Sequence, residues 1–225
     1  RDLFNGPALL SHDVTLDKEG EGPQILIYHT HSQEAFKDSG PQGRTIVEVG
    51  DYLAELLTQK GYRVYHDTSV YDLQSGVLDR SKAYNYALEG VNRILQQNPS
   101  IQVVLDLHRD GVSENLHMVS DINGKPTAQI MFFNGLSRTP EGKIAYLPNP
   151  YLAENLAFSL KMQLGAQAYF PGFARKIYLK GLRYNLHLRP KSALIEAGAQ
   201  TNTFEEVKNA MEPLAQLLDM VLQGE

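Results

Sequence analysis

The sequence predicts an α/β fold: one domain in which helices flank a mostly parallel central sheet. Short apolar runs typical of buried strands alternate with longer segments whose apolar residues recur at helical spacing. Such alternation favours a parallel sheet covered by helices. The chain has 225 residues, of which 42% are apolar and 21% charged, so it can bury one sizeable core. No internal repeat or low-complexity linker divides the chain.

The first 24 residues are mixed in character and are interrupted by several glycines and prolines. We therefore expect a loosely ordered N-terminal lead-in over 1–24 and a single catalytic domain over 25–225.

The domain is expected to begin with a buried strand over 25–28. The helix after it ends at the pair Lys60-Gly61, which is typical of a helix C-terminus. Residues 62–65 alternate as a second strand. A second helix covers 80–97, stops before a proline, and carries Tyr84 on its apolar face.

The strongest strand signal is the β-branched run over 101–107. Residues 115–121 and 127–133 predict two more strands, joined by a hairpin around Asn123-Gly124. Three elements complete the domain: a helix over 151–167, a short buried strand over 192–195 and a closing helix over 204–222.

The composition excludes several classes of function. The formal net charge is −5, so the chain lacks the basic surface that nucleic acid requires, and we expect no nucleic-acid partner. The chain contains no run of about 20 apolar residues, so no membrane span is predicted. There are no cysteines, so any metal ion must be held by His, Asp or Glu. The first residue is Arg rather than Met, which leaves open an N-terminal anchor that has been removed.

Polar clusters follow three of the predicted strands. The segment "YHTHSQE" (Tyr28–Glu34) follows the first strand, "DLHRDG" with His108 follows the strongest, and Glu196 follows the apolar run "ALI". In open α/β sheets, sites form beyond the carboxyl ends of the strands. We therefore expect these side chains to meet at one edge of the sheet.

The residue types in these clusters predict a hydrolytic metal centre. His31 and Glu34 have the spacing H-x-x-E, and His108 would complete a set of three ligands. Catalytic zinc typically keeps three such ligands and an open position, and it lowers the pKa of water to about 7. A further carboxylate must move the proton, and Glu196, after an apolar run, would gain a raised pKa on burial.

Each of these residues also has a simpler interpretation. An H-x-x-E pair arises often by chance, a histidine at a strand end is most often structural, and Glu196 alone could cap a turn. The occurrence of all three features at strand ends favours a metal site. The remaining histidines are expected to be surface or structural residues: His12, His66, His117 and His187.

Three segments, "YHTHSQEAF", "LDLHRDG" and "LIEAGAQTNTFEEV", resemble in this order the stage II sporulation protein P family. The resemblance covers nearly all of the chain from Ile25 to the C-terminus, with weaker echoes in "YFPGFARKIY" and "RYNLHL". This family is similar to the zinc N-acetylmuramoyl-L-alanine amidases. The resemblance therefore implies their phosphorylase/hydrolase-like fold and a Zn²⁺ cofactor.

The resemblance also implies a function. It points to a peptidoglycan hydrolase that cleaves the amide between N-acetylmuramic acid and L-Ala, with an additional endopeptidase activity on cross-links. Such an enzyme acts in engulfment, tethered to a membrane in the space between the mother cell and the forespore. The implied partner is the lytic transglycosylase stage II sporulation protein D.

Carried over by motif, the resemblance implies roles for individual residues. His31 and His108 match the zinc histidines and Glu196 the catalytic carboxylate. Glu34 is chosen as the third ligand, with Glu48 as the alternative. Three further residues are expected to support the ligands or bind substrate: His29, Asp106 and Arg109.

Two rival functions are kept. A zinc carboxypeptidase-like exopeptidase uses the same ligand types, but it needs a cation for the terminal carboxylate of its substrate, which Arg183 or Arg189 could supply. The second rival is a peptidoglycan-binding scaffold without catalysis. The presence of all four proposed metal and base residues argues against it.

Overall fold

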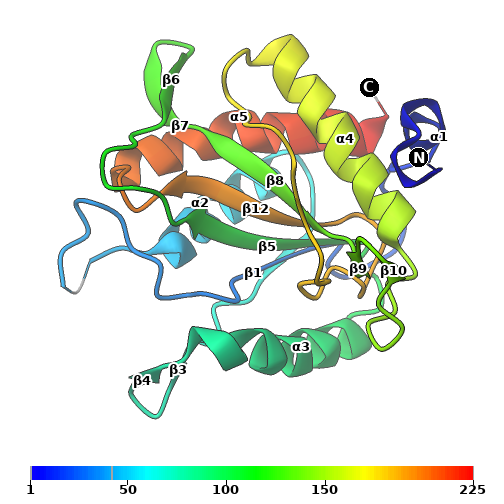
Figure 1. Ribbon diagram of the computed structural model, residues 1–225. Coiled ribbons are helices and arrows are strands. Elements are labelled where there is room, and N and C mark those ends of the chain that lie inside the picture. Colours follow the sequence, from blue (N-terminus) through cyan, green and yellow to red (C-terminus); the bar gives the residue numbers. More distant parts are fainter. Residues whose placement is uncertain (1, 42, 225) are drawn as a thin grey trace.

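The computed structural model describes residues 2–41 and 43–224. Its central sheet (Figure 1) has six strands. Their order across the sheet is β11-β8-β12-β5-β1-β2. In chain order they are β1 (Ile25–Tyr28), β2 (Val64–His66), β5 (Val103–Asp110), β8 (Ile130–Gly135), β11 (Tyr178–Lys180) and β12 (Ser192–Ala199). All neighbours pair in parallel except β8 with β12. The predicted mostly parallel sheet is confirmed.

Helices cover both faces of this sheet (Figure 1). One face packs against α2 (Ile46–Gln59), α4 (Leu152–Tyr169) and α5 (Phe204–Gln223), and the other against α3 (Arg80–Gln97). Alternate residues of β1 explain this, since Ile25 and Ile27 join the large core and Leu26 and Tyr28 the smaller one. No helix in the described ranges has the length and apolarity to cross a membrane.

Two central strands extend further than the sequence predicted. β5 runs on to Asp110 and β12 to Ala199, so His108 and Glu196 lie within the strands rather than beyond them. The two residues are direct partners across the β12–β5 ladder. The ladder continues because it is made by the backbone, which pairs whether the side chains are apolar or polar.

The predicted hairpin is confirmed at Asn123-Gly124, where both residues have positive φ, 54° and 77°. Of the two strands expected beside it, 115–121 corresponds to the shorter β6 (Val119–Ile122), and 127–133 is divided between β7 (Lys125–Ala128) and β8. Several short elements were not predicted: η1 (Asp2–Phe4), α1 (Gly6–Leu10), β3 (Leu73–Gln74), β4 (Val77–Leu78), β9 (Arg138–Thr139), β10 (Gly142–Lys143) and β11.

Residues of the lead-in pack on the domain. Leu9, Val14 and Leu16 are buried in the large core, and the backbone N–H of Leu16 donates to the carbonyl of Leu222 at 2.9 Å. Residues 13–24 contain no regular helix or strand. The division of the chain at residue 25 stays a prediction.

Candidate metal centre

The candidate site lies at the edge of the sheet where β1, β5 and β12 end. These three strands are neighbours and run parallel, so their carboxyl ends meet at the same edge. β5 and β12 bring His108 and Glu196 there as ladder partners, and the loop after β1 carries His31 and Glu34. The sequence-based expectation that these clusters converge agrees with this arrangement.

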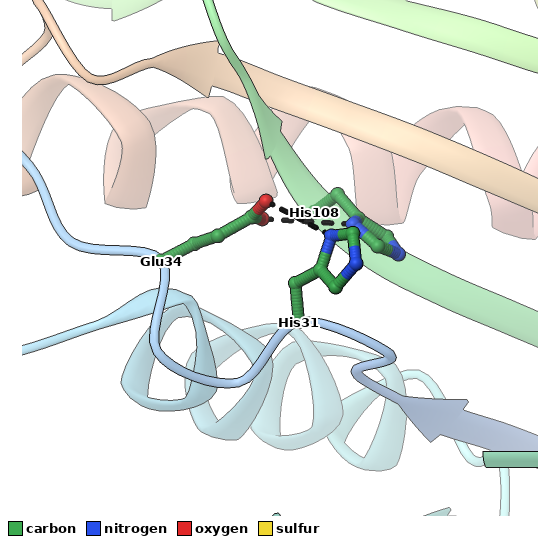
Figure 2. Close-up of side chains that lie close together, drawn as sticks. All are labelled: His31, Glu34 and His108. Carbon is green, nitrogen blue, oxygen red and sulfur yellow. Dashed lines mark ion pairs between the residues drawn. The ribbon is translucent and has the colours of Figure 1, made fainter. Parts of the chain in front are cut away.

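His31, Glu34 and His108 form a cluster in which one ligand atom from each lies within 4.8 Å of the others. Figure 2 shows both histidine rings turned towards the carboxylate. His31 Nδ1 is 3.4 Å from Glu34 Oε1, and His108 Nδ1 is 3.6 Å from Glu34 Oε2. Ligands placed tetrahedrally around zinc at about 2.1 Å are about 3.4 Å apart. The cluster therefore fits a small divalent cation.

Glu34 is buried and held by the backbone of β5. The N–H of Arg109 donates to Glu34 Oε2 at 2.8 Å. Burial alone would raise the pKa of Glu34, but His108, His31 and this N–H hold it well below its ordinary value. The carboxylate is therefore ionised, as a metal ligand must be.

The loop that carries His31 and Glu34 is itself fixed by a buried carboxylate. Asp72 accepts from Ser32 Oγ at 2.7 Å and from the Gln33 N–H at 3.1 Å. These bonds lie between the two ligand positions in the sequence, so they limit the freedom of both. Asp72 follows no strand of the sheet and belongs to no motif, so no sequence signal marked it as part of the site.

His108 is held from its far side by Asp106. Its Nε2 lies 2.8 Å from Asp106 Oδ1, and Asp106 also accepts from the Thr30 N–H at 2.9 Å and from Thr30 Oγ1 at 2.7 Å. Burial would lower the pKa of His108, but Asp106 and Glu34 raise it well above its ordinary value. Two carboxylates around one imidazole thus favour a cation here, either a proton or a metal ion.

Glu196 lies beside this cluster without belonging to it. Its Oε2 is buried and has no hydrogen-bond partner among the residues described. Burial raises the pKa of Glu196 to about 7, with Glu34, Asp110 and Asp106 adding to the rise and His108 opposing it. A carboxyl group with this pKa can take up and release a proton near neutral pH.

His31 has one more feature of a ligand. Its Nε2 is buried and has no hydrogen-bond partner in the described part of the chain. Tyr84 of α3, an unexpected neighbour, packs edge-on to His31 at 5.5 Å between ring centroids and stacks on His108 at 6.5 Å. The sequence placed Tyr84 on an apolar helix face, and only its hydroxyl could have signalled a role at a polar site.

The other candidates are placed elsewhere. His29 is fully buried, donates through Nδ1 to the carbonyl of Leu107 and is hydrogen-bonded through Nε2 to His66. Glu48 completes a capping box at the start of α2, where it accepts from the Thr45 N–H at 2.7 Å. This use of Glu48 favours Glu34 as the third ligand.

The two arginines considered for an exopeptidase bind backbone carbonyls. Arg189 donates to Ile101 at 3.4 Å, just before β5 begins, and Arg183 donates to Pro148 at 3.0 Å. The Arg189 contact lies before the start of β5, at the other end of this strand from His108. The Arg109 side chain donates to the carbonyl of Ala35 at 2.9 Å, close to the cluster.

Comparison with solved structures supports the fold. The CwlD amidase from Clostridioides difficile, solved in complex with the GerS lipoprotein, matches with a TM-score of 0.54 and 13% identity, over 89% of this chain and 96% of that one. The amidase AmiC2 of Nostoc punctiforme has a TM-score of 0.49 and 16% identity, over 90% of this chain and 97% of that one. The first match shows that this chain has the fold of an amidase.

Comparison of sequences identifies the family. Stage II sporulation protein P of Bacillus subtilis (strain 168) is 23% identical in an alignment 215 residues long, which covers 87% of this chain and 50% of that protein. The chain therefore spans about half the length of this relative. The sequence profile of the stage II sporulation protein P family matches residues 8–219. Since that match covers most of the sequence, the chain belongs to the stage II sporulation protein P family.

Proposed function

We propose that this chain is a zinc-dependent peptidoglycan hydrolase that cleaves the amide between N-acetylmuramic acid and L-Ala of the stem peptide. The family and the amidase fold support a cell-wall hydrolase of sporulation. The observation that carries the proposal is Glu196, a carboxyl with a pKa of about 7 beside a His₂Glu cluster that fits a divalent cation.

His31, Glu34 and His108 would hold the zinc ion. When bound, zinc supplies a Lewis acid that polarises the scissile carbonyl and acidifies water. Glu196 takes a proton from the attacking water as the new C–O bond forms. It then gives this proton to the nitrogen of L-Ala as the C–N bond breaks, leaving a carboxylic acid on the muramic acid and a free amine.

Two contacts keep the ligands in place during this reaction. The Asp106 carboxylate, fixed by Thr30, orients the His108 ring, and the N–H of Arg109 orients Glu34. Such supporting groups select the ring orientation and tune the basicity of the ligands. His29 has a structural role in this proposal, because its ring nitrogens are already hydrogen-bonded to the Leu107 carbonyl and to His66.

The test is Glu196→Gln, assayed on purified peptidoglycan after loading with zinc. We expect the variant to retain zinc and to lose activity by about 10²- to 10⁴-fold. Glu19→Gln, at an exposed glutamate of the lead-in, is the matched control and should keep full activity. Wild-type turnover by Glu196→Gln would disprove the assignment of the base.

Product analysis separates the rival functions. Release of intact stem peptides from the glycan supports the amidase, and release of cross-linked peptide fragments supports the additional endopeptidase activity. Release of single terminal residues would support the carboxypeptidase-like exopeptidase, against which the backbone contacts of Arg183 and Arg189 argue. Wall binding without metal and without turnover would support the scaffold.

The biological setting is part of the proposal. We place the enzyme outside the cytoplasm, tethered to a membrane between the mother cell and the forespore during engulfment, and acting with stage II sporulation protein D. Family membership supports this setting. Co-purification of the two proteins from sporulating cells, with and without a membrane-tethering segment, tests both the partner and the tether.

A further inference from the structure

A cavity lies beyond the end of the sheet opposite to the metal centre. Its volume is about 550 Å³, within the range of small-molecule sites. It begins at Leu136, directly after β8, whose antiparallel pairing with β12 brings its C-terminal end towards Ser192. Glu196 stands four residues further along β12, which corresponds to about 13 Å. The proposed hydrolytic reaction makes no use of this cavity.

Three residues that line this cavity each carry a buried polar atom without a partner among the residues described. Ser137 is only 5% exposed, yet its hydroxyl has no hydrogen-bond partner in residues 2–41 and 43–224. The same holds for Asn149 Oδ1 and His187 Nδ1, whose residues also line the cavity. A buried polar group without a partner destabilises the folded state. Three such groups around one cavity point to a ligand that satisfies them.

The cavity is also positively charged, although the whole chain carries a formal net charge of −5. Arg138 and Lys143 line it, and neither forms an ion pair within the described ranges. Leu152, the first residue of α4, lines it as well, and this helix start has no side-chain cap. Free backbone N–H groups at the start of an 18-residue helix favour an anion.

The remaining walls are apolar. They are formed by Leu136, Ile144, Leu147, Pro148 and Pro150. An inorganic anion would leave this apolar surface in contact with water, whereas an organic anion would cover it. The planar guanidinium of Arg138 also matches the two oxygens of a carboxylate. The contents of the cavity therefore favour a carboxylate attached to a small apolar group.

We propose that this cavity binds the free C-terminal carboxylate of a short apolar peptide. The carboxylate would lie between Arg138, the Ser137 hydroxyl and the start of α4, and the adjoining side chain would lie against Ile144 and Leu147. If the proposed function is correct, the natural ligand is a second stem peptide of the wall polymer, held away from the scissile bond. That identification rests on the proposed function, but the binding site itself does not.

The test measures binding of acetyl-alanyl-alanine, in its L,L and D,D forms, to the zinc-loaded protein by calorimetry. Arg138→Gln and Ser137→Ala should each weaken binding, Arg138→Gln by about tenfold. Lys176→Gln removes an exposed charge outside the cavity and should leave the affinity unchanged. The same peptide with a C-terminal amide in place of the carboxylate should bind the wild-type protein no more tightly than the unmodified peptide binds Arg138→Gln.

Each outcome bears on the site independently of hydrolysis. Equal affinity of the wild type and both cavity variants would overturn the proposal, because the peptide would then bind elsewhere, including at the metal. Binding of inorganic phosphate with loss in Arg138→Gln, and no binding of the peptide, would overturn the carboxylate assignment. An active hydrolase without peptide binding at the cavity would refute this site alone.

Discussion

Two clusters, each made of two histidines and one carboxylate, lie close together at the end of β1, and their chemistry differs. One contains His31, His108 and Glu34, and the other contains His29, His66 and Asp51. In the second cluster the Nε2 atoms of the two histidines are hydrogen-bonded at 2.8 Å. The outer nitrogens face Leu107 O at 2.8 Å and Asp51 Oδ1 at 2.9 Å. Every ring nitrogen of this cluster has a partner.

The first cluster is arranged in another way. Both Nδ1 atoms face one carboxylate at 3.4 and 3.6 Å, which is longer than a hydrogen bond, and His31 Nε2 has no partner in the described chain. The comparison shows that composition does not separate a candidate metal site from a structural cluster. The separation comes from whether the polar atoms satisfy one another or leave room for an ion.

The largest expected effect is on metal binding. Glu34→Ala removes a proposed ligand and should lower zinc affinity by at least about 100-fold, with loss of hydrolysis. His66→Asn changes the second cluster, where no atom is a proposed ligand, and should leave zinc content unchanged. Elemental analysis after dialysis measures both variants. Equal zinc loss in the two variants would break the distinction between the clusters.

The second cluster should instead govern stability at acid pH. Burial lowers the pKa of His29 from its ordinary value of 6.5 to about 4, with His66 adding to the shift. Between these values the unfolded chain binds a proton that the folded chain does not. The contribution of neutral His29 to the free energy of unfolding is therefore fully present above pH 6.5. It is lost as the pH falls towards 4, by about 3 kcal/mol at most.

Urea unfolding between pH 7 and pH 4.5 measures this loss, and His29→Asn is the comparison. Asparagine lacks a group that titrates in this range, so the variant should lose less stability than the wild type over the same interval. The difference between the two curves isolates His29 from carboxylates that titrate in both proteins. Parallel curves would mean that His29 does not contribute.

A smaller loss of stability is expected from Gly50→Ala. A Cβ added at Gly50 would lie 2.6 Å from His29 Nε2 and 2.7 Å from His66 Nε2. His29 is fully buried and cannot move aside, so we expect about 2 kcal/mol of destabilisation with zinc binding retained. Gly111→Ala is the control, because nothing lies within 4 Å of its added Cβ. Zinc loss in Gly50→Ala would show that the clusters are coupled.

The sequence predicted the order of the main elements because apolar periodicity marks each buried face. Helix α3 has the predicted bounds, 80–97, and β1 the predicted 25–28. The limits of β5 and β12 were missed because the backbone ladder continues through His108 and Glu196 after the side chains become polar. Apolar periodicity reports side-chain burial. It does not indicate where backbone pairing ends once the side chains become polar.

The candidate site was predictable in part. Motif spacing and strand ends predict that His31, Glu34 and His108 lie close together. The partner of His29 was not predictable, because His66 is 37 residues away and belongs to no motif. Thr30, Asp72 and Tyr84 were not predicted either, because their contacts with the site depend on how loops and α3 pack in three dimensions.

The smallest effect should come from Thr30, which stands in the sequence between His29 of the second cluster and His31 of the first and bonds to Asp106 beside the first. Thr30→Val removes the hydroxyl that donates to Asp106 Oδ2 at 2.7 Å and keeps the backbone N–H that donates to Oδ1 at 2.9 Å.

Asp106 would then hold the His108 ring less firmly, and zinc affinity should fall by about tenfold, the lower end of the effect of such supporting groups. Thr30→Ser keeps the hydroxyl and should bind zinc like the wild type. Competition with a chromogenic chelator measures all three proteins. Equal affinities in Thr30→Val and Thr30→Ser would mean that the backbone N–H alone positions Asp106, and the support of the metal centre would then come from the fold of β1 rather than from this side chain.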